Sequence, residues 1–183
     1  MSKPAGSAIQ YPALAWETAH PERAEWSRIL IDQISLHYDQ LAKAQDQSRI
    51  HPMQGSFGKS ERIRMFAEFM VALAYYESGW DQAASDVDVG SHDDRGSYSD
   101  GLWQVSANDQ EWAAPDLHYS PDALLRMEPN AVLAIRLLAR QVDRTGKIFL
   151  PNSHRDRYWA TLLDGNKYQK IEEISRRVQA AMR

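Results

Sequence analysis

Glu77 is the residue of this 183-residue chain whose position most directly suggests chemistry. It lies near the end of a predicted helix, residues 60–78, whose apolar face consists of Ile63, Phe66, Ala67, Met70 and Ala74. Because Glu77 follows Ile63 by fourteen residues, helical geometry places it within about 40° of this face. Partial burial and the negative end of the helix dipole would both raise the pKa of its carboxyl group. Such a group suits a glycosidase general acid, although Glu77 could instead turn outward into solvent.

A second group of candidate residues lies in an acidic segment, residues 81–100. It contains six aspartates and one arginine, a local net charge of −5 in a chain whose total is −4, and the aspartates are Asp81, Asp86, Asp88, Asp93, Asp94 and Asp100. In an inverting glycosidase a second carboxylate holds a water opposite the acid, and Asp93, Asp94 and Asp100 are the candidates for that base.

The concentration of acid also has two readings that involve no catalysis. Its charge could attract a de-N-acetylated glycan, whose free amino groups are cationic, or the segment could be a solvated loop without substrate contact. The stretch from Asp86 to Gly90 begins like a calcium loop, but Gly90 and Ser97 stand where that loop needs other residues. We therefore expect no metal.

Three further side chains are candidates for substrate binding together with Asp100. Trp103 could form the floor of a sugar subsite or pack in the core. The amide of Gln104 is better suited to a ligand than to a core, because a buried amide needs hydrogen-bond partners. Tyr158 could hydrogen-bond Glu77 or merely pack.

The elements that must position these residues are helical. Apolar periodicity and end signals predict helices over 21–44, 60–78, about 129–145, 154–165 and 168–183, with a short helix within 101–112. No segment shows the alternation of apolar and polar residues that is typical of a strand, so the expected class is all-α. We expect a long acidic loop, in which a short hairpin could form. We expect an irregular segment over 1–20 and one domain over 21–183.

Composition excludes several classes of protein. The chain has 43% apolar residues, enough for one core, but no apolar run long enough to cross a membrane. It has no cysteine, which excludes disulfides, thiolate metal sites and a cysteine nucleophile. Its basic residues are scattered, so nucleic acid is not an expected partner, and we expect a monomer without a cofactor.

Several motifs, taken in order, resemble the lysozyme-like superfamily, in particular goose-type lysozymes and SLT-type soluble lytic transglycosylases. They are Glu77-Ser78, Asp94-Arg95-Gly96, Gly101-Leu102-Trp103-Gln104-Val105, Glu128-Pro129-Asn130 and Arg157-Tyr158-Trp159. The sequence departs from the goose-type pattern at Ser106, where an aspartate often stands, and from the transglycosylase pattern after Tyr158. The resemblance spans roughly residues 66–163.

This resemblance implies cleavage of the β-1,4 bond between N-acetylmuramic acid and N-acetylglucosamine in peptidoglycan, with Glu77 as general acid. The match at Asp94 favours hydrolysis, with Asp94 as the second catalytic residue. The alternatives are lytic transglycosylation, in which Glu77 acts alone, and a non-catalytic glycan-binding relative. The absence of a signal peptide fits either a processed secreted or periplasmic protein or a phage endolysin.

Overall fold

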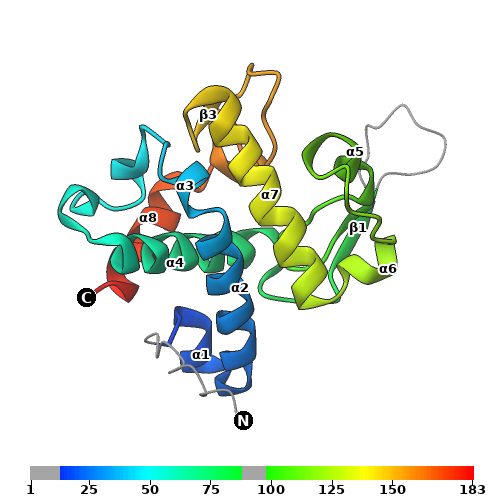
Figure 1. Cartoon of the computed structure of the whole chain (residues 1–183), viewed down its shortest axis with the longest axis horizontal. Helices are drawn as coiled ribbons and strands as arrows, with labels where there is room; N and C mark the ends of the chain where they lie inside the picture. Colours follow the sequence, from blue (N-terminus) through cyan, green and yellow to red (C-terminus); the bar gives the residue numbers. More distant parts are fainter. Residues whose placement is uncertain (1–12, 88–97) are drawn as a thin grey trace, which may run out of the picture.

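One central helix, α4 (Lys59–Ser78), organises the fold (Figure 1). The structure is a computed structural model that describes residues 13–87 and 98–183. Eleven residues of α4 between Ile63 and Ala74 are buried, so the helix is covered on nearly all sides and not only along the predicted stripe. It ends at Gly79, which adopts the left-handed conformation typical of a helix C-terminus.

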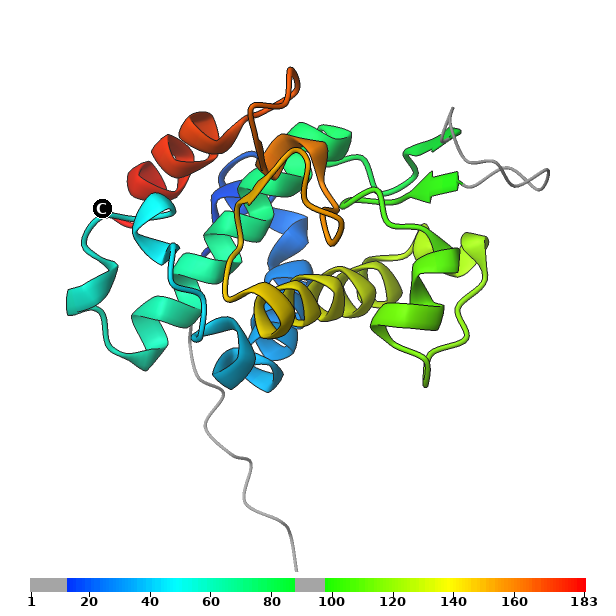
Figure 2. The same cartoon turned by 90° about the horizontal axis from the view of Figure 1, so that it is seen from above.

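Three further long helices form the helical core together with α4. They are α2 (Ala24–Leu36), α7 (Met127–Thr145) and α8 (Ile171–Ala181). α2 contacts both α4 and α7, whereas α8 packs along α4. Seen from above, α8 lies to one side of α4, and a hairpin of two strands extends beyond the C-terminal end of α4 (Figure 2). The C-terminal end of α4, which carries Glu77, therefore lies between the helical core and the hairpin.

The remaining elements are short. The helices are α1 (Ala15–Ala19), α3 (Tyr38–Leu41), α5 (Gln110–Ala113) and α6 (Pro121–Leu124). The 3-10 turns are η1 (Pro21–Arg23), η2 (Gln47–Arg49), η3 (Gln54–Ser56), η4 (Ala107–Asp109) and η5 (Ala160–Leu162).

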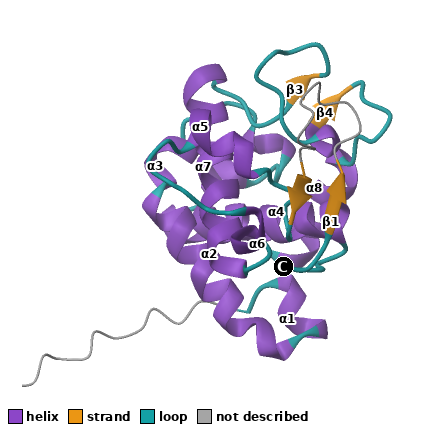
Figure 3. Ribbon diagram, turned by 90° about the vertical axis from the view of Figure 1, so that its right-hand side faces the viewer, coloured by secondary structure: helices purple, strands orange, loops and turns teal. Residues whose placement is uncertain are grey.

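Two pairs of short strands complete the described part of the chain (Figure 3). β1 (Ser85–Val87) and β2 (Tyr98–Asp100) form an antiparallel hairpin in which Ser85 pairs with Asp100. β3 (Leu150–Pro151) runs parallel to β4 (Leu163–Asp164). The all-α class and the hairpin in the acidic segment are therefore confirmed, whereas no local pattern predicted β3 and β4.

Three predictions about elements need correction. The expected helix over 21–44 is interrupted, because η1 precedes α2 and a break at His37 separates α2 from α3. The Ser35 hydroxyl donates to the carbonyl of Ile31, a bond that competes with the helical ladder and favours such a break. Within the segment 1–20, residues 15–19 form α1, because Glu17 accepts a bond from the Leu14 amide and Glu68 accepts one from the Ala15 amide.

The helix expected over 154–165 is also wrong. That segment contains only the single turn η5 and then leads into β4. Its conformation depends on distant partners: β4 pairs with β3, and the Trp159 indole donates to the carbonyl of Trp103 at 2.8 Å. Tertiary hydrogen bonds have here overridden the local apolar pattern.

None of the helices in the described ranges, 13–87 and 98–183, is long and apolar enough to cross a membrane.

Candidate active site

Glu77 lies partly buried in the last turn of α4. The Thr161 hydroxyl, from η5, donates to its Oε1 at 2.6 Å. Burial raises the pKa of the Glu77 carboxyl to about 7, although the bond from Thr161 counteracts part of that rise. The predicted direction of the shift is confirmed, and the outward, solvated orientation is excluded. Near neutral pH the group can exist in both protonation states, as a residue that first donates and then accepts a proton requires.

The end of α4 is fixed by its neighbours. The Ser78 hydroxyl donates to the Leu102 carbonyl at 2.9 Å, which ties the helix to the turn after β2. Trp80 has a φ of 66°, an unusual value for a residue with a side chain. It is held there because Arg23 donates to its carbonyl and its own indole donates to the Val71 carbonyl. These bonds determine where the Glu77 carboxyl lies.

The turn at residues 101–105 is closed by Asn130, a fully buried residue of α7. Its amide nitrogen donates to the carbonyls of Asp100 and Leu124, and its oxygen accepts from the Trp103 amide. Gly101, with a φ of 71°, passes so close that a Cβ would lie 2.4 Å from the Leu124 carbonyl oxygen. The glycine and the asparagine of two separate sequence motifs are therefore parts of one backbone junction.

Trp103 does not form a sugar subsite, and that hypothesis is corrected. Its side chain has no exposed surface, and its indole donates to the Met70 carbonyl at 2.8 Å. The ring lies against that of Trp16, with centroids 6.4 Å apart. Trp103 is a core residue, which was the alternative left open by its apolar neighbours.

Gln104 lies on the same turn, with a φ of 47°. Its amide nitrogen donates to the carbonyls of Gly101 and Ala84, at 2.9 and 3.3 Å. The side chain thus joins the turn to the segment before β1. It is half-buried, so its contact with substrate stays a prediction.

Tyr158 forms its side-chain hydrogen bond with Asp109 and not with Glu77. Its hydroxyl donates a hydrogen bond to Asp109 Oδ2 at 2.5 Å and accepts one from the Ser106 amide at 3.2 Å. Burial and the nearby charges of Asp109 and Glu77 raise the pKa of Tyr158 well above its ordinary value. The phenol therefore stays protonated, and it connects η4 to the segment that carries Thr161.

Two residues of this site were absent from the sequence-based hypotheses. Nothing in the local pattern singles out Thr161. Asp109 could have been noticed, because Ser106 and Asp109 form a capping box at the start of η4, in which the Ser106 amide donates to the Asp109 carboxylate. That signal would have predicted a structural role but not the bond to Tyr158.

Three aspartates, Asp93, Asp94 and Asp100, were the candidates for the base that holds a water, and the structure describes one of them. Asp100 is 3% exposed and accepts a bond from the Ser85 hydroxyl inside the hairpin. Buried in this way it reaches neither substrate nor a catalytic water, so both roles predicted for Asp100 are corrected. Asp93 and Asp94 lie outside the described residues. In the ranges 13–87 and 98–183, no group of three or more histidine and acidic side chains could hold a metal ion.

A helical domain with a partly protonated glutamate at the end of its central helix, beside a small hairpin, is a lysozyme-like architecture. The model of the transglycosylase SLT domain family matches residues 56–163. The chain belongs to this family, whose substrate is peptidoglycan. A search of curated proteins found no match.

The fold also matches solved structures titled Bd0314 DslA. The wild-type form 2 has 22% sequence identity and a TM-score of 0.76, over 92% of this chain and 94% of that one. Two variants of the same protein, each with a glutamate replaced by glutamine, match over 92% of this chain with TM-scores of 0.76 and 0.74. Their coverage of the DslA chain is 97% and 93%. At this identity the similarity concerns the fold.

Proposed function

We propose that this protein is a lytic transglycosylase that cleaves the β-1,4 bond between N-acetylmuramic acid and N-acetylglucosamine. The observation that carries the proposal is the environment of Glu77, a partly buried carboxyl with a pKa of about 7 at the end of α4. Family membership supports the same reaction. Transglycosylation also needs no second carboxylate to hold a water. Of the described acidic residues near this site, Asp100 is buried, and Asp109 already accepts hydrogen bonds from Tyr158 and Ser106.

In this reaction Glu77 acts twice. Its protonated carboxyl first donates a proton to the glycosidic oxygen as the bond to C1 of the muramyl residue breaks. The resulting carboxylate then accepts the proton of the muramyl 6-hydroxyl while that oxygen bonds to C1. No water is consumed, and the products are a free 4-hydroxyl and a 1,6-anhydro ring. The pKa near 7 lets one group fill both roles.

Hydrolysis is the second candidate, and it rests on the Asp94-Arg95-Gly96 resemblance to goose-type lysozymes. A water held by Asp94 or Asp93 would replace the 6-hydroxyl as nucleophile. The two glutamates replaced in the DslA variants are eleven positions apart, and this chain carries Asp88 eleven positions after Glu77. Asp88 therefore joins the residues to be tested.

Mass spectrometry of digested peptidoglycan distinguishes the two reactions. Transglycosylation gives 1,6-anhydro ends, whereas hydrolysis gives reducing ends that carry the mass of one water. We expect anhydro ends and a loss of about 10²–10⁴ in rate for Glu77→Gln, the usual contribution of general acid catalysis. Asp88→Asn, Asp93→Asn and Asp94→Asn should each retain activity.

Reducing ends together with a large loss in one of the aspartate variants would establish hydrolysis instead. If the wild-type protein binds glycan strands but releases no product, the non-catalytic alternative is correct. A Glu111→Gln variant, changed at an exposed position of α5, controls for the loss of a carboxylate as such.

The substrate preference forms a separate part of the proposal. Residues 81–100 have a net charge of −5, and Asp81 and Asp86 are exposed. Pairing with the amino groups of de-N-acetylated peptidoglycan would favour that form of the glycan. The test compares kcat/KM on acetylated and deacetylated strands at low and high salt. Equal kcat/KM values on the two kinds of strand, at low and at high salt alike, would disprove the preference.

A protein with this activity must reach the cell wall. We therefore propose a secreted or periplasmic location, or release from the cell interior during phage lysis.

A further inference from the structure

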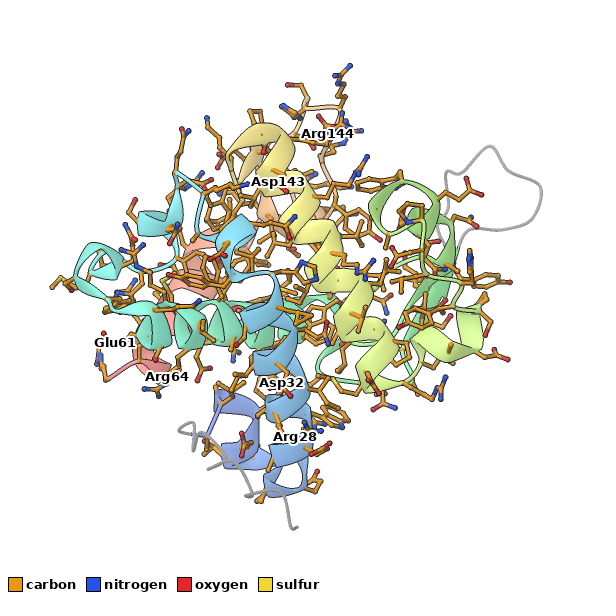
Figure 4. All side chains as sticks on the ribbon, in the orientation of Figure 1. Arg28, Asp32, Glu61, Arg64, Asp143 and Arg144 are labelled. Atoms are coloured by element: carbon orange, nitrogen blue, oxygen red, sulfur yellow. The ribbon has the colours of Figure 1, made fainter. Side chains whose placement is uncertain are left out.

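A cleft of about 760 Å³ lies at the C-terminal end of α7. One wall is the end of that helix and the turn after it, with Arg144 and Lys147. The other wall is the segment after β3, with His154, Arg155 and Asp156. Figure 4 shows Arg144 at this end of α7, at the edge of the molecule.

The cleft is cationic in a protein that is anionic overall. Three of its lining residues are arginine or lysine, and one is an aspartate. Asp156 pairs with Arg144 at 2.8 Å, and its other carboxylate oxygen lies 3.8 Å from Nε of Arg155. The Arg155 side chain is 86% exposed. Asp156 thus faces Arg144 and Arg155, whereas the charge of Lys147 acts on Asp164 outside the lining. The lining keeps an excess of positive charge, which favours an anionic ligand.

The segment that lines the cleft also leads into the site of Glu77. Arg155 precedes Thr161 by six positions, a distance of at most about 22 Å along the chain. Thr161 in turn donates to Glu77. One stretch of backbone therefore limits the separation between the cationic cleft and the proposed site of glycan cleavage.

The substrate of the proposed reaction carries anions on an extended arm. Each muramyl residue bears a peptide stem on its lactyl group, and four extended residues span up to about 14 Å. The stem has free carboxylates along its length and at its end. A strand bound with a muramyl residue beside Glu77 can extend these carboxylates toward the cleft.

We propose that this cleft binds the carboxylates of the peptide stem, so that the protein recognises peptide-bearing strands and not bare glycan. The inference rests on the proposed function, because only cleavage of peptidoglycan brings a stem to this position. Lys147 and Arg155 supply the positive charge of the cleft beyond the pair of Arg144 and Asp156. An exposed ion pair changes affinity by between about 1.4- and fivefold, so two pairs together would give an effect of about two- to 25-fold.

The test compares kcat/KM on intact glycan strands with kcat/KM on strands whose stems an amidase has removed. We expect the wild-type protein to prefer intact strands, and the preference to weaken at high salt, because exposed ion pairs are screened. Lys147→Gln combined with Arg155→Gln should lower the ratio of the two values by about two- to 25-fold. Lys167→Gln combined with Arg176→Gln removes the same charge from exposed positions elsewhere and should leave the ratio unchanged. An unaltered ratio in the first double variant would overturn the proposal.

A direct binding measurement separates this proposal from the proposed function. In an NMR titration with the soluble stem N-acetyl-L-Ala-γ-D-Glu-L-Lys-D-Ala, signals around the cleft should shift in the wild-type protein and much less in the Lys147→Gln, Arg155→Gln protein. If the wild-type protein cleaves neither kind of strand, the proposed function fails, and this titration still decides what the cleft binds. Binding to phosphatidylglycerol vesicles that depends on these two residues, without any response to the stem, would overturn the proposal in favour of a membrane surface.

Discussion

At the scale of single residues, the chemistry of the site depends on the balance between burial and one hydrogen bond at Glu77. Burial disfavours the carboxylate form, whereas the Thr161 hydroxyl stabilises it. A carboxyl group with only the first influence would be a weaker acid, and so a poorer proton donor to the glycosidic oxygen. Thr161 is thus the residue that adjusts the acidity of Glu77 for the two tasks proposed for it.

Replacing Thr161 by valine should move the alkaline limit of activity to higher pH. The hydroxyl lowers the pKa of Glu77, so its loss raises that pKa above about 7, and the acid stays protonated further into the alkaline range. A hydrogen bond worth about 1 kcal/mol corresponds to roughly 0.7 pH units. The pH profile of kcat measures the shift. Thr161→Ser keeps the hydroxyl and should retain the wild-type profile, and an unchanged limit in Thr161→Val would contradict this role.

Tyr158 and Asp109 should depend on each other for stability. Tyr158→Phe removes the hydrogen bond to the Asp109 carboxylate and one of the two acceptors of the Ser106 amide, at a cost of about 1–3 kcal/mol. A double-mutant cycle with Asp109→Asn, measured by urea unfolding, should give a coupling energy above about 0.5 kcal/mol. Tyr168→Phe, at a 57% exposed position, is the control and should be neutral. Additive losses would mean that the bond between Tyr158 and Asp109 adds no stability.

At the scale of elements, three segments that are distant in sequence hold the turn at 101–105. α4 contributes Ser78, α7 contributes Asn130, and the segment before η5 contributes Trp159. Each of these side chains bonds to backbone of the turn. The motifs recognised in the sequence are therefore largely structural, and they maintain the position of Glu77 relative to the hairpin.

Gly101→Ala tests how tightly this junction is packed. The added Cβ would meet the Leu124 carbonyl at 2.4 Å and the Asn130 amide at 2.5 Å, in addition to the strain of a φ of 71°. We expect a loss of at least about 3 kcal/mol in unfolding free energy together with a loss of activity. Gly165→Ala is the matched control, because its φ is 76° but no atom lies within 4 Å of the new Cβ. It should cost about 1 kcal/mol, from backbone strain alone. Equal losses in the two variants would show that the junction can relax.

At the scale of the whole molecule, two buried carboxyl groups link stability to pH. Glu68, 2% exposed on α4, accepts a bond from the Ala15 amide at the start of α1. Burial raises its pKa to about 7, as it does for Glu77. The folded protein therefore binds more protons than the unfolded chain between pH 4.5, the ordinary value for glutamate, and about pH 7.

The protein should accordingly lose stability as the pH rises. The contribution of both groups is complete below about pH 4.5 and is lost as the pH passes about 7. Each shift corresponds to at most about 3 kcal/mol. Chemical unfolding between pH 5 and 8 measures the decline, which should be much smaller in a Glu68→Gln, Glu77→Gln double variant. Glu111→Gln, at an exposed position, should follow the wild-type curve. Equal wild-type stability at pH 5 and pH 8 would disprove the linkage.

Local pattern was sufficient for the main helices and for the position of Glu77. Apolar periodicity and terminal glycines are short-range properties, so they predicted α4, α7 and α8 and placed a carboxyl group at the end of a buried face. The acidic segment, with its small residues and aspartates, was compatible in composition with a short hairpin. The same reasoning failed over 154–165, where the apolar residues serve contacts with other elements and not a helix face.

The partners of the candidate acid were decided by tertiary structure alone. Thr161 lies 84 positions from Glu77, and Tyr158 lies 49 positions from Asp109. Which side chains meet over such separations depends on how the helices pack, and no periodicity within one element encodes it. The burial of Trp103 was undecidable for the same reason, since an aromatic beside a functional turn can face substrate or core. The sequence determined which residue could be the acid, and the packing of α4, α7 and η5 decided what surrounds it.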